Sequence, residues 1–265
     1  MTDKKTPVMM NTLSMFDLTG KRALITGSSR GIGLALAQGL SGAGAEIVLN
    51  GRNLQAMENA AEMLRDLGAT VSCSEFDVTD PEAVQQEIKR IEEEQGPIDI
   101  LINNAGMQYR APLESFPVEQ FDQIMRTNLN SAFYVGQAVA NYMIKRGSGK
   151  IINICSAMTK LARPSIAPYT ASKGAIANLT KGMATDWARL GLNINGIAPG
   201  YFKTELNEAL VADETFSHWL EKRTPMGRWG EVPELVGAAI YLSSDASSYV
   251  NGHILYVDGG ITVSI

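Results

Sequence analysis

The chain has 265 residues, 45% of them hydrophobic and 19% charged, and this composition is typical of folded globular proteins and excludes a fibrous or intrinsically disordered chain. Its length fits one large α/β domain with a shared core. The net charge of -5 at pH 7 provides no basic surface field, so we expect no nucleic acid partner.

Cysteine usage and hydropathy limit the compartment. Cys73 and Cys155 are far apart and belong to no CxxC or Cys/His pattern, which predicts neither a disulfide framework nor a metal site. The N-terminal residues are charged early and lack the apolar centre of a signal peptide, and no later stretch reaches about 18 uncharged apolar residues. We therefore expect a cytoplasmic protein without a membrane segment.

Short β-branched runs alternate with longer helical patterns along the chain. Strands are predicted at residues 22–26, 46–50, 70–75, 100–103, 150–154, 192–197 and 254–258. Segments between them carry apolar residues three and four positions apart, as helices packed on a sheet require. The alternation predicts an α/β fold, a single-domain Rossmann-like doubly wound parallel sheet of about seven strands with helices on both faces.

Three local features refine this plan. Residues 1–15 are predicted to form a flexible N-terminal arm, with residues 16–265 as the single Rossmann-fold domain. Asp80 and Pro81 predict a helix start, with aspartate as N-cap and proline at the first helical position. The polar and aromatic stretch 201–229 departs from the β–α rhythm and is predicted to be a substrate lid.

Glycines mark the turn between the first strand and the helix that follows it. Glycine permits a tight turn and the close approach of a pyrophosphate, whose charge is favoured at a helix N-terminus. The spacing here is GxxxGxG rather than the GxGxxG dinucleotide fingerprint, and a tight βα connection without a ligand is the alternative. The turn predicts a dinucleotide site formed by Gly27, Ser29, Arg30, Gly31, Ile32 and Gly33.

The end of the second predicted strand bears on the choice of cofactor. An NAD site usually places an acidic residue there to bind the ribose 2′-hydroxyl, but this chain has Asn50, Gly51 and Arg52. No carboxylate repels a 2′-phosphate, and Arg52 and Arg30 can both pair with it. This pattern predicts NADP(H), unless both arginines are only solvated surface residues.

Tyr169 and Lys173 are four residues apart, which on a helix places both side chains on one face. A phenol titrates near pH 10, about three units too high for proton exchange near neutrality, and a neighbouring ammonium lowers that pKa. Ser156 follows the strand at 150–154, at the sheet edge where ligands of such folds bind. The three residues predict proton transfer to or from a substrate oxygen that Ser156 holds.

The motifs TGSSRGIG and YTASK, with Asp77, residues 103–106, Asn128, Ser156 and residues 199–200, resemble the short-chain dehydrogenase/reductase family from about Lys21 to the C-terminus. The resemblance implies an NADP-dependent oxidoreductase acting on a CH–OH group, with hydride transfer to a carbonyl carbon. It implies that Asn128, Ser156, Tyr169 and Lys173 are catalytic, with Asn128 holding a water that links Lys173 to solvent.

The same resemblance implies further cofactor contacts. Asp77 and Val78 are expected beside the adenine, and Thr204 at the nicotinamide carboxamide. The remaining expected cofactor contacts are Asn104, Ala105, Gly106, Tyr169, Lys173, Pro199 and Gly200.

The stretches NICS, IAPGYFKTE, RWG and VNGHILYVDGG are similar to the gluconate 5-dehydrogenase (5-keto-D-gluconate 5-reductase) branch of that family. This likeness implies a sugar acid or polyol substrate, whose carboxylate needs a cation. The expected substrate contacts are Arg110, Ser156, Arg163 and Tyr201, and further cations for the carboxylate are Lys203, Arg223 and Arg228. The chain departs from the branch pattern at Tyr109 and Lys160.

Two alternatives stay open. A 3-oxoacyl carrier-protein reductase or another small-ketone reductase would share the general pattern. A non-enzymatic NADP(H)-sensing regulator would share the fold, but such a protein is expected to lack the serine, tyrosine or lysine. The apolar C-terminal stretch predicts burial in a subunit contact, and the family resemblance implies a homotetramer.

Overall fold

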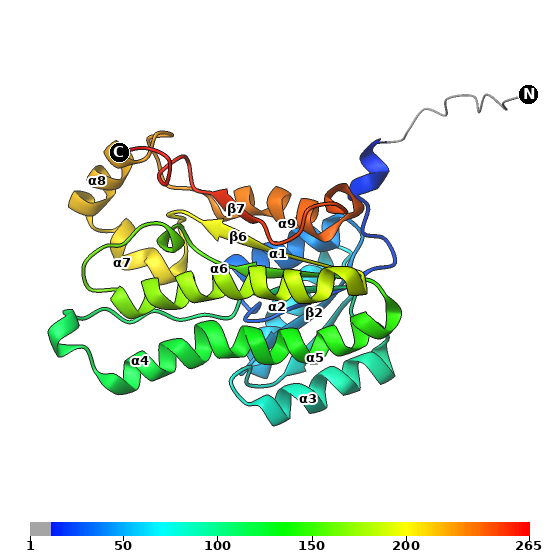
Figure 1. Cartoon of the computed structure of the whole chain (residues 1–265). Helices are drawn as coiled ribbons and strands as arrows, with labels where there is room; N and C mark the ends of the chain where they lie inside the picture. The colour runs from blue at the N-terminus through cyan, green and yellow to red at the C-terminus, as the bar shows by residue number, and fades with distance from the viewer. Residues whose placement is uncertain (1–11) are drawn as a thin grey trace, which may run out of the picture.

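The computed structural model describes residues 12–265, so positions 1–11 of the predicted arm lie outside the described residues, and Thr12–Phe16 form a short 3-10 helix. One parallel sheet with the strand order β3-β2-β1-β4-β5-β6-β7 organises the described chain (Figure 1). Its strands are β1 (Arg22–Ile25), β2 (Glu46–Gly51), β3 (Val71–Glu75), β4 (Ile100–Asn103), β5 (Gly149–Ile154), β6 (Leu192–Pro199) and β7 (Ile254–Val257). The predicted doubly wound fold is confirmed.

Helices cover both faces of the sheet. They are α1 (Gly31–Gly42), α2 (Leu54–Asp66), α3 (Pro81–Arg90), α4 (Val118–Met125), α5 (Ser131–Arg146), α6 (Ala167–Trp187), α7 (Glu208–Val211), α8 (Glu214–Arg223) and α9 (Val236–Ser243). One face packs on α1, α2 and α9 and the other on α3, α5 and α6. Among residues 12–265, no helix is both long and apolar enough to span a membrane.

The five strands between the edge strands β3 and β7 are largely buried on both faces, because successive side chains point to opposite sides of a sheet that helices cover on both sides. In β1, Ala23 and Ile25 belong to the core beneath α1, α2 and α9, whereas Leu24 belongs to the core beneath α3, α5 and α6. All three side chains are fully buried. Continuous apolar runs therefore predicted these strands correctly.

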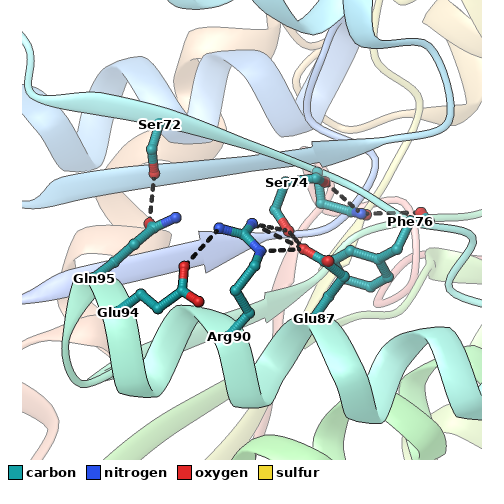
Figure 2. Close-up of polar contacts among 8 residues, drawn as sticks. Ser72, Ser74, Phe76, Glu87, Arg90, Glu94 and Gln95 are labelled. Carbon is teal, nitrogen blue, oxygen red and sulfur yellow. Dashed lines mark hydrogen bonds and ion pairs between the residues drawn. The ribbon is translucent and has the colours of Figure 1, made fainter.

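A polar network fixes α3 to β3 at one side of the sheet, as Figure 2 shows. Ser74 Oγ donates to Glu87 Oε2 at 2.9 Å, and Arg90 Nη2 donates to the same carboxylate oxygen at 2.8 Å. Burial by itself raises the pKa of Glu87, but the hydrogen bonds from Arg90 and Ser74 lower it overall. The start of α3 is as predicted, since Asp80 accepts hydrogen bonds from two backbone amides of the first turn. The network holds in place the strand whose end leads to Asp77.

The segment 201–229 leaves the sheet after β6 and contains α7 and α8, which lie at the same end of the molecule as the C-terminus (Figure 1). Its two ends are joined by a β-bridge between Phe202 and Gly230. Gly230 N donates to Tyr201 O at 2.9 Å, and Lys203 N donates to Gly230 O at 3.0 Å. The segment is therefore a loop closed at a narrow neck.

Candidate active site

A cleft of about 1220 Å³ opens at the C-terminal ends of the strands, the edge at which open α/β sheets bind ligands. The glycine turn after β1 lines one end, and residues after β5 and β6 line the other. Ser156, Tyr169 and Lys173 belong to the same lining as Gly31 and Thr204. The structure thus brings the predicted cofactor and catalytic residues into one site.

The glycine turn has the geometry that an anion needs. Gly27 and Gly31 have positive φ angles of +61° and +57°, a conformation that side-chain-bearing residues rarely adopt. A Cβ at Gly33 would lie 2.5 Å from Gly27 O, so only glycine fits there, whereas a Cβ at Gly31 would meet no protein atom within 4 Å. The turn is tightly packed at Gly33 and open at Gly31, where a pyrophosphate can approach the helix N-terminus.

Asn104 and Thr26 join this turn to the next strand. Asn104 Nδ2 donates to Thr26 O and to Gly27 O, both at 2.9 Å. Thr26 Oγ1 accepts hydrogen bonds from Asn104 N at 2.9 Å and Ala105 N at 3.0 Å. The sequence reasoning missed Thr26, although its place directly before Gly27 was a signal that its hydroxyl lies at the end of β1.

Arg30 and Arg52, the cations predicted to bind the 2′-phosphate, line the cleft, and their side chains are about three quarters exposed. Arg52 Nη1 is 3.7 Å from Asp77 Oδ2, and Arg30 Nη1 is 3.0 Å from Glu205 Oε2. Burial raises the pKa of Asp77, but hydrogen bonds from Thr79 and the charge of Arg52 lower it overall. Both arginines are exposed and held only by surface ion pairs, which are weak enough for a 2′-phosphate to replace them.

Of the other predicted cofactor contacts, Ser29, Ile32, Val78, Ala105, Gly106, Pro199, Gly200 and Thr204 line the cleft. Gly33 is not part of that lining, because it packs behind the turn. A Cβ at Gly200 would lie 2.7 Å from Asp258 Cα, so glycine is required where β6 passes β7. Gly33 and Gly200 therefore shape the site through packing.

Tyr169 is partly buried and lines the cleft together with Ser156, whose hydroxyl lowers the pKa of the phenol. Ser156 in turn accepts a hydrogen bond from Met158 N at 3.1 Å, which fixes the serine at the start of a 3-10 turn. Burial raises the pKa of Tyr169, and the hydrogen bond from Ser156 offsets only part of that effect. The predicted lowering of this pKa was wrong for the protein's own side chains, because desolvation of the phenolate outweighs the help of its neighbours.

Lys173 explains why the ammonium does not lower that pKa. Its side chain is buried, and burial lowers the pKa of Lys173 from 10.5 to about 8. Nζ donates to Ile154 O at 2.7 Å and lies 5.8 Å from the centroid of the Tyr169 ring. Lys173 therefore stands one turn from the tyrosine, as the sequence predicted, with a proton that is held weakly.

Asn128 lies in a π-helical turn, Arg126–Asn130, which interrupts the helix formed by α4 and α5. Such turns are common at functional sites because they redirect side chains. Asn128 Oδ1 accepts from Met107 N at 2.8 Å, and Nδ2 donates to Met107 O at 2.9 Å and to Ser172 Oγ at 3.0 Å. A Cβ at Gly106 would be 3.4 Å from Asn128 Oδ1 and 3.9 Å from Lys173 Nζ. Asn128 and Lys173 thus flank the same small space beside Gly106.

The substrate end of the cleft holds Arg110, Arg163 and Tyr201. Burial lowers the pKa of Arg110, and the charge of Arg163 lowers it further. Arg110 Nε is buried without a hydrogen-bond partner, and neither arginine forms an ion pair within residues 12–265. Two neighbouring cations without a carboxylate form a site for an anion.

The other cations considered for the carboxylate have partners elsewhere. Lys203 pairs with Glu231 at 2.6 Å and Arg228 with Glu234 at 2.7 Å. Arg223 Nη1 donates to Ser264 Oγ at 2.7 Å. These three side chains stabilise the neck of the segment 201–229 and its contact with the C-terminus, and none of them lines the cleft.

Tyr109 and Lys160, where the chain departs from the branch pattern, also point away from the substrate. The Tyr109 ring packs edge-on against Phe116, with centroids 5.6 Å apart. Lys160 Nζ lies 4.2 Å from the centroid of the Tyr256 ring. Neither residue lines the cleft, so these differences leave its described lining unchanged.

Aromatic side chains connect α8 to both ends of the segment 201–229. Trp229 is buried, donates from Nε1 to Ser217 Oγ at 3.1 Å and packs edge-on against Tyr201. The Phe216 ring packs at tilted angles against Tyr201, Trp219 and Trp229, with centroid distances of 5.3 to 6.1 Å. The sequence did not single out Phe216, since an aromatic residue on a short helix carries no signal of its partner.

Comparison with known proteins agrees with this geometry. Residues 27–262 match the family described as enoyl-(acyl carrier protein) reductase. Gluconate 5-dehydrogenase of Gluconobacter oxydans (strain 621H) is 63% identical over 251 residues, which cover 95% of this chain and 98% of that protein. The chain belongs to the short-chain dehydrogenase/reductase family.

Two more relatives of this dehydrogenase/reductase extend the likeness. 5-Keto-D-gluconate 5-reductase of Escherichia coli (strain K12) is 48% identical over 251 residues, covering 95% of this chain and 99% of that protein. The structure of a gluconate 5-dehydrogenase from Burkholderia cenocepacia J2315 in complex with NADP and tartrate is 56% identical, with a TM-score of 0.94 over 96% of this chain and 100% of that one. The predicted resemblance to this branch of the family is confirmed.

Proposed function

We propose that this protein is an NADP(H)-dependent oxidoreductase that interconverts D-gluconate and 5-keto-D-gluconate. The observation that carries the proposal is one cleft that joins Ser156, Tyr169 and Lys173 to a glycine turn at one end and two unpaired arginines at the other. Relatives named for this reaction are 48% and 63% identical to the chain. The arginines favour an anionic substrate over a neutral ketone.

The residues present fit a dinucleotide phosphate. The open face at Gly31 leaves room for a pyrophosphate, and Arg30 and Arg52 stand exposed at the same end of the cleft. Asp77 and Val78 would hold the adenine, and Thr204 the nicotinamide carboxamide. When bound, the cofactor supplies the hydride for reduction and accepts it in oxidation. A relative's structure contains NADP, which supports the choice of cofactor.

Residues of the chain itself carry out the proton transfer. The Ser156 hydroxyl holds the substrate oxygen by a hydrogen bond, and Tyr169 donates its proton to that oxygen in the reductive direction. The raised pKa of Tyr169 keeps the phenol protonated near neutrality. In oxidation, Tyr169 takes the proton from the substrate hydroxyl. Lys173, beside Asn128, would hold the nicotinamide ribose and supply positive charge near the phenolate.

The alternatives have less support. A carrier-protein reductase needs a basic surface for its acidic partner, and the chain has a net charge of -5. A cofactor-sensing regulator has no need of the serine, tyrosine and lysine together. The sugar-acid reaction uses all three residues and also the two arginines.

The testing experiment mixes purified protein with NADPH and 5-keto-D-gluconate and follows the loss of absorbance of the reduced nicotinamide. NADH and neutral ketones serve as parallel arms. We expect fast reduction with NADPH and slower reduction with NADH. Reduction of neutral ketones but not of the keto acid would discard the substrate and keep the reaction class. Cofactor binding with no turnover of any carbonyl would favour the regulator.

Assembly, lid and location complete the proposal. We propose a homotetramer, because Val263 and Ile265 at the apolar C-terminus are exposed in the single chain and such residues are costly to leave in water. Sedimentation velocity tests this state.

We also propose that the segment 201–229 is a substrate lid, since its closed neck lets it move as a unit. Reduced thiols at Cys73 and Cys155 fit a cytoplasmic location.

A further inference from the structure

The loop between Ser156 and Tyr169 carries Arg163 and is held in an uncommon conformation. Within residues 12–265, Ser165 is the one non-glycine residue with a positive φ, at +67°. Its carbonyl oxygen accepts a hydrogen bond from Ala111 N at 3.2 Å. Because Ala111 follows Arg110 directly, this bond joins the two arginine-bearing loops. Backbone strain of this kind persists where surrounding structure enforces it, commonly at functional sites.

Arg163 contacts the segment 201–229 on its other side. Its guanidinium carbon lies 5.1 Å from the centroid of the Phe216 ring, within the range of a cation–π interaction. Phe216 lies in α8 and packs against Trp219 and Trp229. Arg163 therefore lines the cleft and also contacts α8.

The charges around Arg163 leave a place for one anion. Arg110 repels it and has a buried Nε without a partner. The phenol of Tyr201 is near enough that both arginines lower its pKa, although burial raises the pKa overall. A carboxylate between the arginines would relieve their repulsion and accept the free donor of Arg110. The Arg163 guanidinium contacts the Phe216 ring and forms no ion pair within residues 12–265.

We propose that Arg163 is a specificity-determining residue whose guanidinium N–H groups hold the substrate carboxylate while its contact with the Phe216 ring anchors α8. The inference rests on the proposed function and deepens it: acid substrates fasten the segment 201–229 over the cleft, and neutral polyols of the same shape do not. The enzyme thus selects sugar acids by coupling a charge contact to closure of the cleft.

The test compares D-gluconate with D-sorbitol, which has the same carbon chain with a hydroxymethyl group in place of the carboxylate. In Arg163→Met with NADP⁺, we expect kcat/KM for D-gluconate to fall by about 10- to 100-fold, the range for a hydrogen bond to a charged group. The value for D-sorbitol, which has no carboxylate for Arg163 to bind, should fall much less, so the ratio of kcat/KM for D-gluconate to that for D-sorbitol should drop. Arg163→Lys keeps the charge but loses the planar fork, so it should recover only part of the loss.

Phe216→Leu tests the contact between Arg163 and α8, and Lys160→Met is the matched control variant. Phe216→Leu keeps an apolar side chain but removes the ring, so KM for D-gluconate should rise about 2- to 5-fold with D-sorbitol unaffected. When Phe216→Leu is added to Arg163→Met, the ratio of kcat/KM for D-gluconate to that for D-sorbitol should not change further. Lys160 lies in the same loop as Arg163 but outside the cleft, and its ammonium contacts the Tyr256 ring. Lys160→Met removes this cation, and the ratio of kcat/KM for D-gluconate to that for D-sorbitol should not change.

A second readout does not depend on turnover. In the wild-type protein with NADP(H), D-gluconate should slow hydrogen exchange at the amides of α8, and D-sorbitol should not. In Arg163→Met, D-gluconate should also have no effect on α8. Equal losses with both substrates, or slowed exchange that persists without Arg163, would overturn the inference. Absence of gluconate turnover with intact, Arg163-dependent slowing of exchange would instead refute the proposed reaction.

Discussion

The buried Lys173 predicts a stability that rises with pH, opposite to the effect of a salt-bridged lysine, whose pKa is raised by folding. Its pKa is about 8 in the folded chain and about 10.4 in an unfolded chain. Between these values the unfolded state binds more protons, so the stability of the folded state rises with pH. Below about pH 8 both states are protonated, and the full cost of burying the ammonium is present, about 3 kcal/mol at pH 7.

The perturbation is Lys173→Met, which removes the titrating group and keeps an unbranched side chain. From the same two pKa values, the free energy of unfolding of the wild type relative to the variant should increase by about 2 kcal/mol between pH 7 and 9.5. The lost hydrogen bond from Nζ to Ile154 O shifts the variant by a constant amount, which the comparison across pH removes.

The assay is urea unfolding of both proteins at several pH values, at one protein concentration and without cofactor, followed by circular dichroism. A difference in unfolding free energy that stays flat between pH 7 and 9.5 would refute the reasoning, because Lys173 would then titrate alike in both states. A difference that falls as pH rises would mean that the folded chain stabilises the ammonium.

The other predictions concern the two halves of the cleft. Tyr169→Phe should lower kcat by about 10² to 10⁴ with NADPH binding retained; near wild-type turnover would remove tyrosine from the mechanism. Because the pKa of Tyr169 is raised, gluconate oxidation by the wild type should accelerate from pH 7 to 9.5, and a flat profile of the chemical step would contradict this. Arg52→Asp places a second carboxylate beside Asp77, and the preference for NADP(H) over NAD(H), from KM ratios, should fall about 10- to 100-fold; an unchanged ratio would show that Arg52 is only a surface residue. Gly33→Ala sets a Cβ 2.5 Å from a backbone oxygen of the glycine turn, so NADPH titration should show weakened binding, whereas Gly237→Ala, with open space around it, should bind normally.

The proposed closure of the segment 201–229 and the proposed proton transfer involve different residues of the same cleft. In the proposed mechanism the proton passes at Tyr169, whose pKa depends on Ser156 and on burial. The contacts of α8 with the cleft run through Phe216 and Arg163 instead. Variants at Arg163 should therefore change the choice between acid and neutral substrates without shifting the pH profile of the chemical step.

Sequence by itself determined the features that depend on neighbours in the chain. Apolar runs predicted the seven strands, Asp80 predicted its helix start, and the spacing of Tyr169 and Lys173 predicted one helix face. The glycine turn was visible because its backbone conformation excludes other residues at Gly27 and Gly31.

Only the tertiary structure decided which distant groups meet and how deeply they are buried. It placed Arg163 beside Arg110 and Phe216, and it gave Lys203 a partner outside the cleft. It also raised the pKa of Tyr169, where sequence reasoning from a nearby ammonium predicted the reverse. The reason is that charge pairing and desolvation depend on packing between segments far apart in the chain, which local periodicity does not encode.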